Sequence, residues 1–370
     1  MQKKLTNSAD FFRTILPKVS RTFAINIKLL KGIDYTAICC AYLICRILDT
    51  IEDDPHLSDE KKIKYLTAFS KMWKEKNPSN DPSKNLGKNP SKDSSKFGEW
   101  GKKIPLKPLI KEEEILVKRS AEIFEVFFSL PPPYQKAIHD AVLEMAMGMT
   151  LFIKRYRNKK IKHLSTLKEL HQYCYYVAGT IGKLLTAIFC LKIKDKNRRK
   201  KLENICVDFG QGLQMVNILK DCWRDQKRNW IYIPKEVIKK HGLTTKQFFN
   251  KENPQKCQKI YRELISQTEN NLKKSIFYVE TLPRSFYRYR IFCLLPLSMA
   301  LKTLLLLKRH DFSKKASKST ETSRATEAKK ATEATTRDKI SRKDIRAIVL
   351  KAYFFAPSNF AVRTFCQSML

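Results

Sequence analysis

The sequence predicts an all-α protein, and three observations lead to this prediction. Apolar residues recur at helical spacing through most of the chain, strand-like alternation is scarce, and two helical segments carry matching stripes of acidic residues. The length of 370 residues and the hydrophobic content of 43% suffice for one large domain or two ordinary ones. We therefore expect a helical fold in which the acidic stripes mark the functional site.

The first acidic stripe lies in residues 42–54. On a helix of 3.6 residues per turn, the positions that share one face are Tyr42, Arg46, Asp49 and Asp53, with Glu52 at the edge. The positions between them are mostly apolar, so little of this helix resembles a solvated surface. We expect its carboxylates to be buried or to line a cavity.

The second acidic stripe lies in residues 214–225 and follows the same helical phase. Its face is formed by Gln214, Asn217, Asp221 and Asp225, and apolar side chains again fill the remaining positions. One stripe alone is equally compatible with a solvated face paired with lysines. Two stripes of equal phase in apolar sequence favour a functional site.

Carboxylates in an apolar setting need a cationic partner, because desolvating an unpaired charge costs several kcal/mol or more. Neither stripe has Cys or His at ligand spacing, and oxygen donors alone suit a hard ion. Mg²⁺ is the usual choice when a phosphate completes the coordination. The stripes therefore predict Mg²⁺ and a phosphorylated substrate.

The other elements follow in chain order. Ser20 and Arg21 before Phe23 are typical of a capped helix start, and Arg21 also suits a phosphate. Helices are expected over residues 57–73, 109–130, 134–153, 164–190, 255–308 and 342–355, with a short extended segment at 228–234.

Three of these expectations concern the core. Gly179 and Gly182 inside the apolar helix over 164–190 indicate the close approach of a neighbouring helix or an apolar ligand. The apolar run 291–307 is short for a membrane span and is interrupted by Pro296 and Lys302, so a buried helix is expected. The ten cysteines lack framework spacing and are expected as core thiols in a reducing compartment.

Two low-complexity segments are expected as surface insertions, at about 74–108 and 311–338. Residues 74–108 and 308–346, which contain these segments, carry about a third of the net charge of +37, so the folded body is itself strongly basic. Such a body attracts nucleic acid, an anionic membrane or a diphosphate, and charge alone does not choose among them. No signal peptide is expected, because polar residues follow Met1, and no C-terminal anchor is expected after Pro357.

These residues together resemble the squalene/phytoene synthase family of head-to-head prenyl synthases. The family motifs are similar to Ser20–Phe23, to Asp49–Asp53, to Tyr173–Gly179 and to Gln214–Asp225, in the same order. The resemblance covers nearly the whole chain apart from the two insertions. It implies a single isoprenoid-synthase-type helical domain over residues 1–370, built around a central cavity.

The resemblance also implies a reaction. Two farnesyl diphosphates would condense through presqualene diphosphate, and NADPH would reduce the product to squalene. Catalysis is assigned to Tyr173, Asp49, Asp53, Asp221 and Asp225, and Mg²⁺ to the same four aspartates with Glu52. Substrate binding is assigned to Ser20, Arg21, Phe23, Tyr42, Arg46, Gln214, Asn217, Lys220, Arg228 and Phe292. NADPH is assigned to Arg342 and Lys343, which resemble a region that the squalene branch uses for this cofactor. The chain has no Gly-x-Gly-x-x-Gly fingerprint, so any NADPH site is not a Rossmann one.

Several features leave the branch of the family open. Phe292–Pro296 resembles the squalene-synthase branch, whereas Trp230–Pro234 resembles phytoene synthases. Lys220 stands where the family usually has Arg, Arg224 where it has an acid, and Trp230 where an Arg is usual. An arginine binds a phosphate through two parallel hydrogen bonds, whereas Lys220 offers a single point charge.

Three alternatives accompany the leading hypothesis. The first is a non-reductive enzyme that forms presqualene diphosphate, dehydrosqualene or phytoene. The second is a non-catalytic relative acting as an assembly factor, and the third is a nucleic-acid binder, although no nucleic-acid motif is present. We expect a cytoplasmic monomer that is peripheral to the membrane and binds no nucleic acid.

Overall fold

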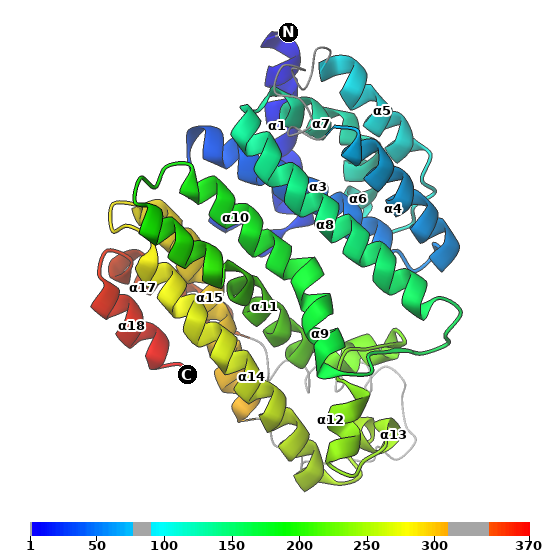
Figure 1. Ribbon diagram of the computed structural model, residues 1–370, viewed down its shortest axis with the longest axis vertical. Helices are drawn as coiled ribbons and strands as arrows, with labels where there is room; N and C mark the ends of the chain where they lie inside the picture. Colours follow the sequence, from blue (N-terminus) through cyan, green and yellow to red (C-terminus); the bar gives the residue numbers. More distant parts are fainter. Residues whose placement is uncertain (1, 77–89, 310–339) are drawn as a thin grey trace. The chain divides into compact units, whose positions relative to one another are not determined.

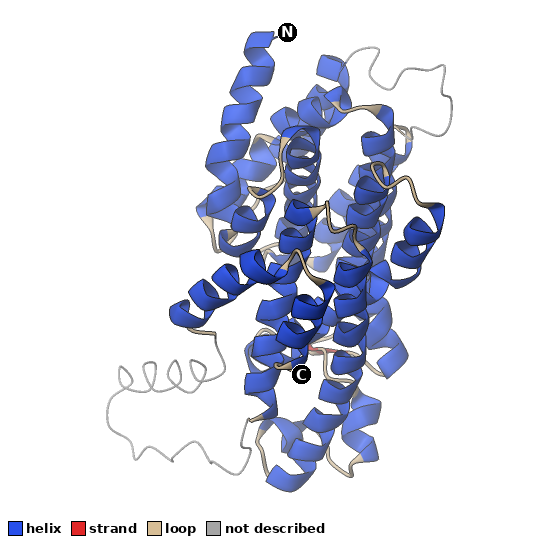
Figure 2. Cartoon of the chain, turned by 90° about the vertical axis from the view of Figure 1, so that its left-hand side faces the viewer, coloured by secondary structure: helices blue, strands red, loops and turns tan. Residues whose placement is uncertain are grey.

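The computed structural model describes residues 2–76, 90–309 and 340–370, and these residues are almost entirely helical, as predicted (Figures 1 and 2). In chain order, the elements are α1 (Gln2–Val19), α2 (Arg21–Ile27), α3 (Gly32–Asp53), α4 (Asp59–Lys74), α5 (Pro90–Lys102), α6 (Lys111–Lys118), α7 (Ser120–Ser129), α8 (Pro132–Tyr156), β1 (Lys162–His163), α9 (Leu167–Cys174), the π-helix η1 (Tyr175–Gly179), α10 (Thr180–Cys190), α11 (Lys196–Lys227), β2 (Trp230–Ile231), α12 (Lys235–Lys240), α13 (Thr245–Phe249), α14 (Pro254–Thr281), α15 (Tyr287–Lys308), α17 (Arg342–Phe355) and α18 (Asn359–Gln367).

The chain divides into two compact units. Unit 1 comprises Met1–Asn158 and Gly179–Glu203, and unit 2 comprises Lys159–Ala178 and Asn204–Leu370. Each unit buries its own set of apolar side chains. That both units form the single domain predicted from the family resemblance stays a prediction.

The core of unit 1 contains a cluster of stacked aromatic rings. Trp73 on α4 lies 4.6 Å from Phe127 and 5.4 Å from His139 between ring centroids, and Trp73 Nε1 donates to the carbonyl of His139 at 2.9 Å. Phe97 on α5 stacks on Phe124 of α7 at 4.0 Å. Offset aromatic pairs of this kind contribute about 0.5–1.5 kcal/mol beyond the area that they bury.

Part of the expected insertion at 74–108 belongs to this core, so that prediction was wrong for residues 90–108. They form α5 and its exit, and the side chains of Phe97, Trp100, Ile104 and Leu106 are buried. The Lys-rich composition hid these four apolar residues. Residues 77–89 of that insertion, and the whole of the insertion at 311–338, lie outside the described residues.

Two buried aspartates hold the ends of α3, the helix that carries the first stripe. Near its start, Asp34 accepts a hydrogen bond from Tyr134 at 2.8 Å and forms an ion pair with Lys192. At its end, Asp54 accepts backbone N–H bonds from His56 and Lys107, each at 2.7 Å. The position of the stripe between them is thereby determined.

In unit 2, close packing on α14 positions α11, the helix of the second stripe. A Cβ atom added at Gly212 would lie 3.1 Å from Leu272 and 3.2 Å from Asn271, so the backbones approach too closely for a larger side chain. Tyr261 of α14 donates its hydroxyl proton to the carbonyl of Leu219. These contacts bury one side of α11 and leave its polar face outward.

The region between residues 162 and 233 departs from the expected single helix over 164–190. The extended exit was predicted correctly: β2 pairs in parallel with β1, joining Lys162 to Trp230 and His163 to Ile231. The helix is divided by the π-helical turn η1, which changes the side-chain phase along it. Regular α-helical spacing would place Tyr173, Tyr176 and Gly179 on one face, and that spacing does not hold there.

Two segments are long and apolar enough to cross a membrane, judged by length and composition alone: Leu167–Cys190 and Tyr287–Lys308. Of the most apolar 18-residue stretch, 56% is buried in the first segment and 67% in the second. Most residues of the second are packed in the core, Leu294, Leu295 and Leu301 among them. The expectation of a buried helix over 291–307 is confirmed. All ten cysteines are buried free thiols, which also confirms their expected place in the core.

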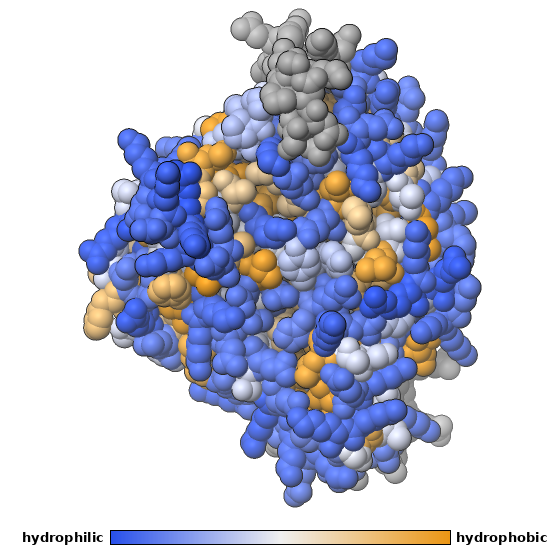
Figure 3. Space-filling view, in the orientation of Figure 1, coloured by the Kyte–Doolittle hydropathy of each residue, from blue (hydrophilic) through white to orange (hydrophobic). Residues whose placement is uncertain are grey.

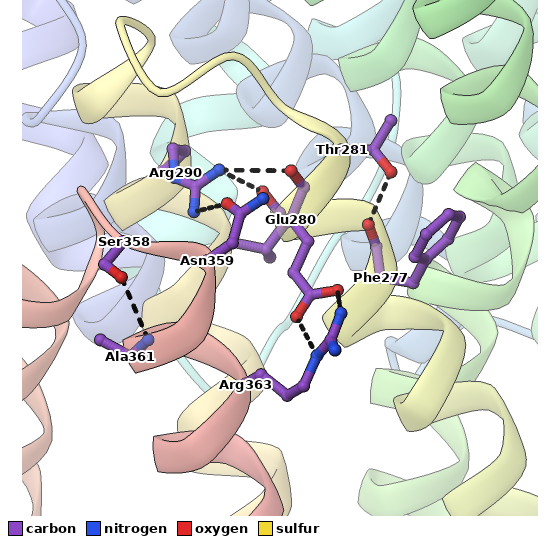
Figure 4. A network of polar contacts seen from close by, with 9 residues as sticks. Phe277, Glu280, Thr281, Arg290, Ser358, Asn359, Ala361 and Arg363 are labelled. Carbon is purple, nitrogen blue, oxygen red and sulfur yellow. Dashed lines mark hydrogen bonds and ion pairs between the residues drawn. The ribbon is translucent and has the colours of Figure 1, made fainter.

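A buried arginine joins four elements of unit 2 (Figure 4). Arg290, at the start of α15, donates to the carbonyls of Val279 at 2.9 Å and Leu282 at 2.8 Å, at the end of α14. It also donates to the carbonyl of Ala356 and, at 2.8 Å, to Asn359 Oδ1. The last carbonyls of a helix are left unpaired within it and carry partial negative charge, so a guanidinium stabilises them.

We predict that Arg290→Gln lowers the free energy of unfolding by about 3–5 kcal/mol, because it leaves several buried carbonyls without a donor. Urea denaturation followed by circular dichroism would measure this change. Arg13→Gln is the control, since that exposed arginine lies 3.9 Å from an exposed partner, Asp10, and its loss should change the midpoint little. Equal midpoints for wild type and Arg290→Gln would contradict the role assigned to Arg290.

Candidate functional site

The first stripe begins with a polar contact between α2 and α3. Ser20 caps α2 by accepting the N–H of Phe23 at 3.2 Å, and it is hydrogen-bonded to the hydroxyl of Tyr42. The rings of Phe23 and Tyr42 lie 5.8 Å apart. Burial raises the pKa of Tyr42 to about 12, so this phenol stays protonated as a hydrogen-bond donor. These three predicted residues are brought together.

Arg46 occupies the next turn of α3 and lies between two carboxylates. Its Nη2 atom forms an ion pair with Glu113 of α6, and its Nη1 atom lies 3.9 Å from Asp49. Its Nε atom is buried and has no hydrogen-bond partner within the part of the chain that the structure describes. Arg46 therefore balances the carboxylates and retains one donor.

Glu113 is a site residue that the sequence reasoning missed. It is buried, whereas its neighbours Glu112 and Glu114 are half-buried. The only available signal was the run of three acids in the first turn of α6, and such a run is typical of any helix N-terminus. Spacing could not reveal that one member pairs with Arg46.

Asp49 carries the most perturbed carboxylate of the stripe. Burial raises its pKa to about 7, Arg46 opposes this shift, and the carboxylates of Asp53 and Glu113 reinforce it. Its side chain nevertheless keeps 34% of its surface exposed. A half-buried carboxylate with acidic neighbours binds a cation in place of its proton.

Asp53, one turn later, is exposed, and Glu52 is half-buried. Of the two expectations for these carboxylates, burial does not hold for Asp53, because α3 ends there at the surface, and a place in a cavity stays a prediction. The stripe runs from a buried end at Tyr42 to an open end at Asp53.

The second stripe has a different charge balance. Asp221 Oδ2 lies 2.9 Å from Arg224 Nη2 and 3.2 Å from Lys220 Nζ, and Lys220 also reaches Asn217 Oδ1 at 3.5 Å. Residues 220–228 hold four basic and two acidic side chains, whereas residues 46–54 hold one arginine and four acids. The first stripe is thus suited to a cation and the second to an anion.

The remaining predicted residues of α11 line its outward face. Gln214 and Asp225 are half-buried, whereas Asn217 and Arg228 are exposed. The arginine that replaces the family's usual acid, Arg224, is the residue that holds Asp221. This departure from the family pattern changes the partner of a predicted metal ligand.

Mg²⁺ stays a prediction. Among the described residues, no group of three or more His, Cys, Asp and Glu side chains is arranged to hold a metal ion. The donors assigned from the sequence are all carboxylate oxygens, which suit Mg²⁺, and the raised pKa of Asp49 indicates a place where positive charge is lacking. The residues therefore fit a Mg²⁺ ion that substrate phosphates help to hold.

Tyr173 lies in an aromatic row within unit 2. Its ring is buried and lies 4.7 Å from that of Tyr232, and the two hydroxyls are 3.1 Å apart. Tyr232 in turn stacks on Trp230 at 5.4 Å. Tyr232 was read only as part of the extended exit, so its contact with Tyr173 is a second feature that the sequence analysis missed.

Four predicted residues remain, and no contact of theirs with these groups is described. Phe292 is buried in α15, and Lys343 is exposed in the first turn of α17. Arg342 begins the same helix, which a capping box between Ser341 and Asp344 starts. Arg21 begins α2, next to Ser20.

The comparisons with known proteins agree with this description. The sequence profile of the family described as squalene/phytoene synthase matches residues 16–325. The chain belongs to this family. A squalene synthase of Nicotiana benthamiana is 26% identical over 298 residues, covering 80% of this chain and 63% of its own length. A squalene synthase of Mus musculus is 29% identical over 306 residues, covering 82% and 64%.

These relatives do not by themselves decide the activity. The chain spans slightly less than two thirds of their length. A protein of Arabidopsis thaliana named inactive squalene synthase 2 is 27% identical over 308 residues, covering 80% of this chain and 64% of its own length. Similarity to this protein is as high as to the active ones, so the argument for activity rests on individual residues.

Solved structures show the same fold. A structure described as the complex of TcSQS with the ligand BPH1237 has a TM-score of 0.66 at 22% identity, covering 97% of this chain and 99% of its own. A dehydrosqualene synthase structure has a TM-score of 0.62 at 16% identity, covering 95% and 98%. The all-α fold predicted from the sequence is confirmed.

We predict that Asp49→Asn stabilises the metal-free protein above pH 7. The folded-state pKa of Asp49 is raised to about 7, so the folded protein favours the neutral carboxyl group. The contribution of this group to the stability of the fold is present at low pH and is lost as pH rises through about 7. An amide does not titrate, and we expect a gain of about 1 kcal/mol at pH 8, discounted for solvent screening, and a smaller gain at pH 5. Thermal melts at both pH values measure it.

The control for this prediction is Asp54→Asn, which should lower the melting temperature at both pH values because Asp54 accepts backbone bonds on both oxygens. Addition of Mg²⁺ should raise the melting temperature of the wild type and leave that of Asp49→Asn unchanged. A lower melting temperature for Asp49→Asn at pH 8 would contradict the assignment.

We predict that Arg224→Glu strengthens Mg²⁺ binding by about tenfold, because it frees Asp221 and adds an acid beside it. It should also weaken the binding of inorganic diphosphate measured without metal. Isothermal titration with each ligand tests both effects. The control is Lys227→Glu, which makes the same charge change three residues away and should alter both affinities less. If the two variants have equal effects, net charge explains the result and the ion pair between Arg224 and Asp221 has no specific role.

Proposed function

We propose that this protein condenses two farnesyl diphosphates head to head in a Mg²⁺-dependent reaction, passes through presqualene diphosphate, and reduces it with NADPH to squalene. The proposal rests chiefly on one observation: a chain of this family keeps both acidic stripes, on α3 and α11, with their carboxylates at least partly accessible. An inactive relative would have no reason to keep Asp49 in a setting that raises its pKa.

In this proposal, Asp49, Glu52, Asp53, Asp221 and Asp225 hold Mg²⁺, which when bound neutralises the diphosphate and stabilises it as a leaving group. Arg21, Lys220 and Arg228 donate charge-assisted hydrogen bonds to the diphosphate oxygens. Arg46 offers its unpaired Nε donor and keeps the carboxylates apart from one another. The hydroxyls of Ser20 and Tyr42 orient this end of the site.

The hydrocarbon chemistry needs a dry and aromatic environment, because water would quench an allylic cation. Tyr173 is buried, and its ring and that of Phe292 would stabilise such a cation by up to about 2 kcal/mol each. The proton lost when the cyclopropane closes would pass to Tyr173 or to the released diphosphate. As Tyr173 accepts this proton, it would pass its own hydroxyl proton to Tyr232, whose hydroxyl is 3.1 Å away, and the released diphosphate would be the final acceptor.

The reductive step is the less supported part of the proposal. NADPH is assigned to Arg342 and Lys343 at the start of α17, and the exposed basic side chain of Lys343 suits a phosphate. The alternative is a non-reductive enzyme that releases presqualene diphosphate, dehydrosqualene or phytoene. The Trp230–Tyr232 stack on the exit strand is the observation that favours it.

We further propose a cytoplasmic monomer that works at the membrane surface and binds no nucleic acid. Its substrates and product are lipids, and its net charge of +37 favours an anionic surface. Binding to anionic vesicles without binding to DNA at physiological salt would support this assignment. The reverse result would revive the nucleic-acid alternative.

The deciding experiment incubates the purified protein with farnesyl diphosphate and Mg²⁺, with and without NADPH, and identifies the products by mass spectrometry. Squalene formed only with NADPH supports the reductive reaction. Dehydrosqualene or presqualene diphosphate under both conditions supports the alternative. No turnover of farnesyl or geranylgeranyl diphosphate would support a non-catalytic relative.

We predict that Tyr173→Phe lowers kcat by about 100-fold, the usual scale for loss of a general base. Tyr232→Phe should lower kcat by less than Tyr173→Phe, since the proton acceptor remains. Single-turnover measurements at saturating substrate separate this effect from binding. A greater loss in Tyr232→Phe than in Tyr173→Phe would reverse the two roles.

A further inference from the structure

The outer surface of the C-terminal helices exposes large apolar side chains. Leu350 and Phe354 on α17 keep 73% and 80% of their surface exposed, and Phe360 on α18 keeps 79%. Tyr353 beside them is also exposed. We call these four residues the C-terminal apolar surface. Leu350 and Phe354 are one turn apart on α17, and α18 packs against that helix through Phe355 and Phe365, whose ring centroids are 5.2 Å apart. Exposed apolar residues on neighbouring helices indicate an interaction site, whereas single ones do not.

Helix α17 has two apolar sides rather than one. Ile348, Ala352 and Ala356 are buried and recur every four residues, so they form the inner side. Leu350 and Phe354 are one turn apart and belong to the outer side. Burial within unit 2 therefore explains the apolar residues on the inner side of this helix and not those on its outer side.

This surface is held rigidly in unit 2 (Figure 4). Arg290 joins Ala356 and Asn359, at the corner between α17 and α18, to the end of α14. Arg363 of α18 forms two bonds to Glu280, at 2.8 and 2.9 Å. The hydroxyl of Tyr287 donates to the carbonyl of Tyr353 at 2.7 Å. The exposed rings thus extend from a fixed corner, which lowers the entropy cost of binding.

The charges around the surface have one sign. Residues 342–363 contain five basic side chains and one acid. That acid, Asp344, accepts bonds from Ser341 and lies 3.6 Å from Lys302. Lys343, Arg346 and Lys351 are exposed. On the outer side of α17, Lys343 and Arg346 precede Leu350 and Phe354 by one and two turns of the helix.

We propose that the C-terminal apolar surface docks on an anionic lipid bilayer. Leu350, Phe354 and Phe360 enter the boundary between headgroups and acyl chains, and Arg346 and Lys351 bind lipid phosphates. Apolar insertion combined with basic contacts is how interfacial helices hold a membrane, and a lipid surface complements both features at once. The remainder of the protein's surface is mostly hydrophilic on the face shown in Figure 3, with smaller separate apolar patches.

The proposal deepens the proposed function, since a bilayer would supply its lipid substrates, but its test uses no catalysis. Sedimentation with vesicles of phosphatidylcholine and phosphatidylglycerol measures binding directly. We expect the wild type to bind these vesicles and to bind pure phosphatidylcholine about tenfold more weakly. Leu350→Ser/Phe354→Ser should lose about tenfold in affinity, and Arg346→Glu/Lys351→Glu should lose the preference for anionic lipid.

The matched control is Leu109→Ser/Ile161→Ser, which removes two large exposed apolar side chains from residues outside this surface. It should bind vesicles as the wild type does. If it loses as much affinity as Leu350→Ser/Phe354→Ser, the proposal is overturned. Unchanged binding of Leu350→Ser/Phe354→Ser would overturn it as well. A wild-type dimer in sedimentation velocity that Phe354→Ser converts to monomer would assign the surface to a second copy of the chain instead. Circular dichroism of each variant verifies that it is folded.

Discussion

The candidate site depends on holding charged side chains on a helix whose other faces are buried. On α3, burial favours the neutral form of Asp49, and a single arginine shared with Glu113 is the counter-charge next to it. Such an arrangement persists only if the helix cannot turn or shift. Asp34 and Asp54 provide this restraint, since each is a buried acceptor with partners outside α3.

The two acidic stripes resemble each other in sequence and differ in electrostatics. The first has an excess of carboxylates around Arg46, and the second has an excess of cations around Asp221. A reaction that uses two diphosphates has two anionic groups to neutralise. Within the proposed function, metal ions would neutralise diphosphate mainly at the stripe on α3, whereas basic side chains would contact diphosphate more directly at the stripe on α11.

A buried charge with fixed partners also organises the C-terminal part of unit 2. Arg290 is a buried cation held by carbonyl groups at the end of α14 and by the corner between α17 and α18. Helix α18 follows that corner and was not predicted from the sequence. One guanidinium thus determines where the last two helices lie, and with them the C-terminal apolar surface.

The sequence by itself determined the helical class, the phase of both acidic stripes and the family, because helical periodicity and motif order are local properties. It could also place the extended exit and the buried helix over 291–307. Only the tertiary structure decided that Glu113 pairs with Arg46, that Tyr232 meets Tyr173, and that residues 90–108 belong to the core. Each of these joins residues far apart in the chain, and no local spacing records which side chains packing will bring together.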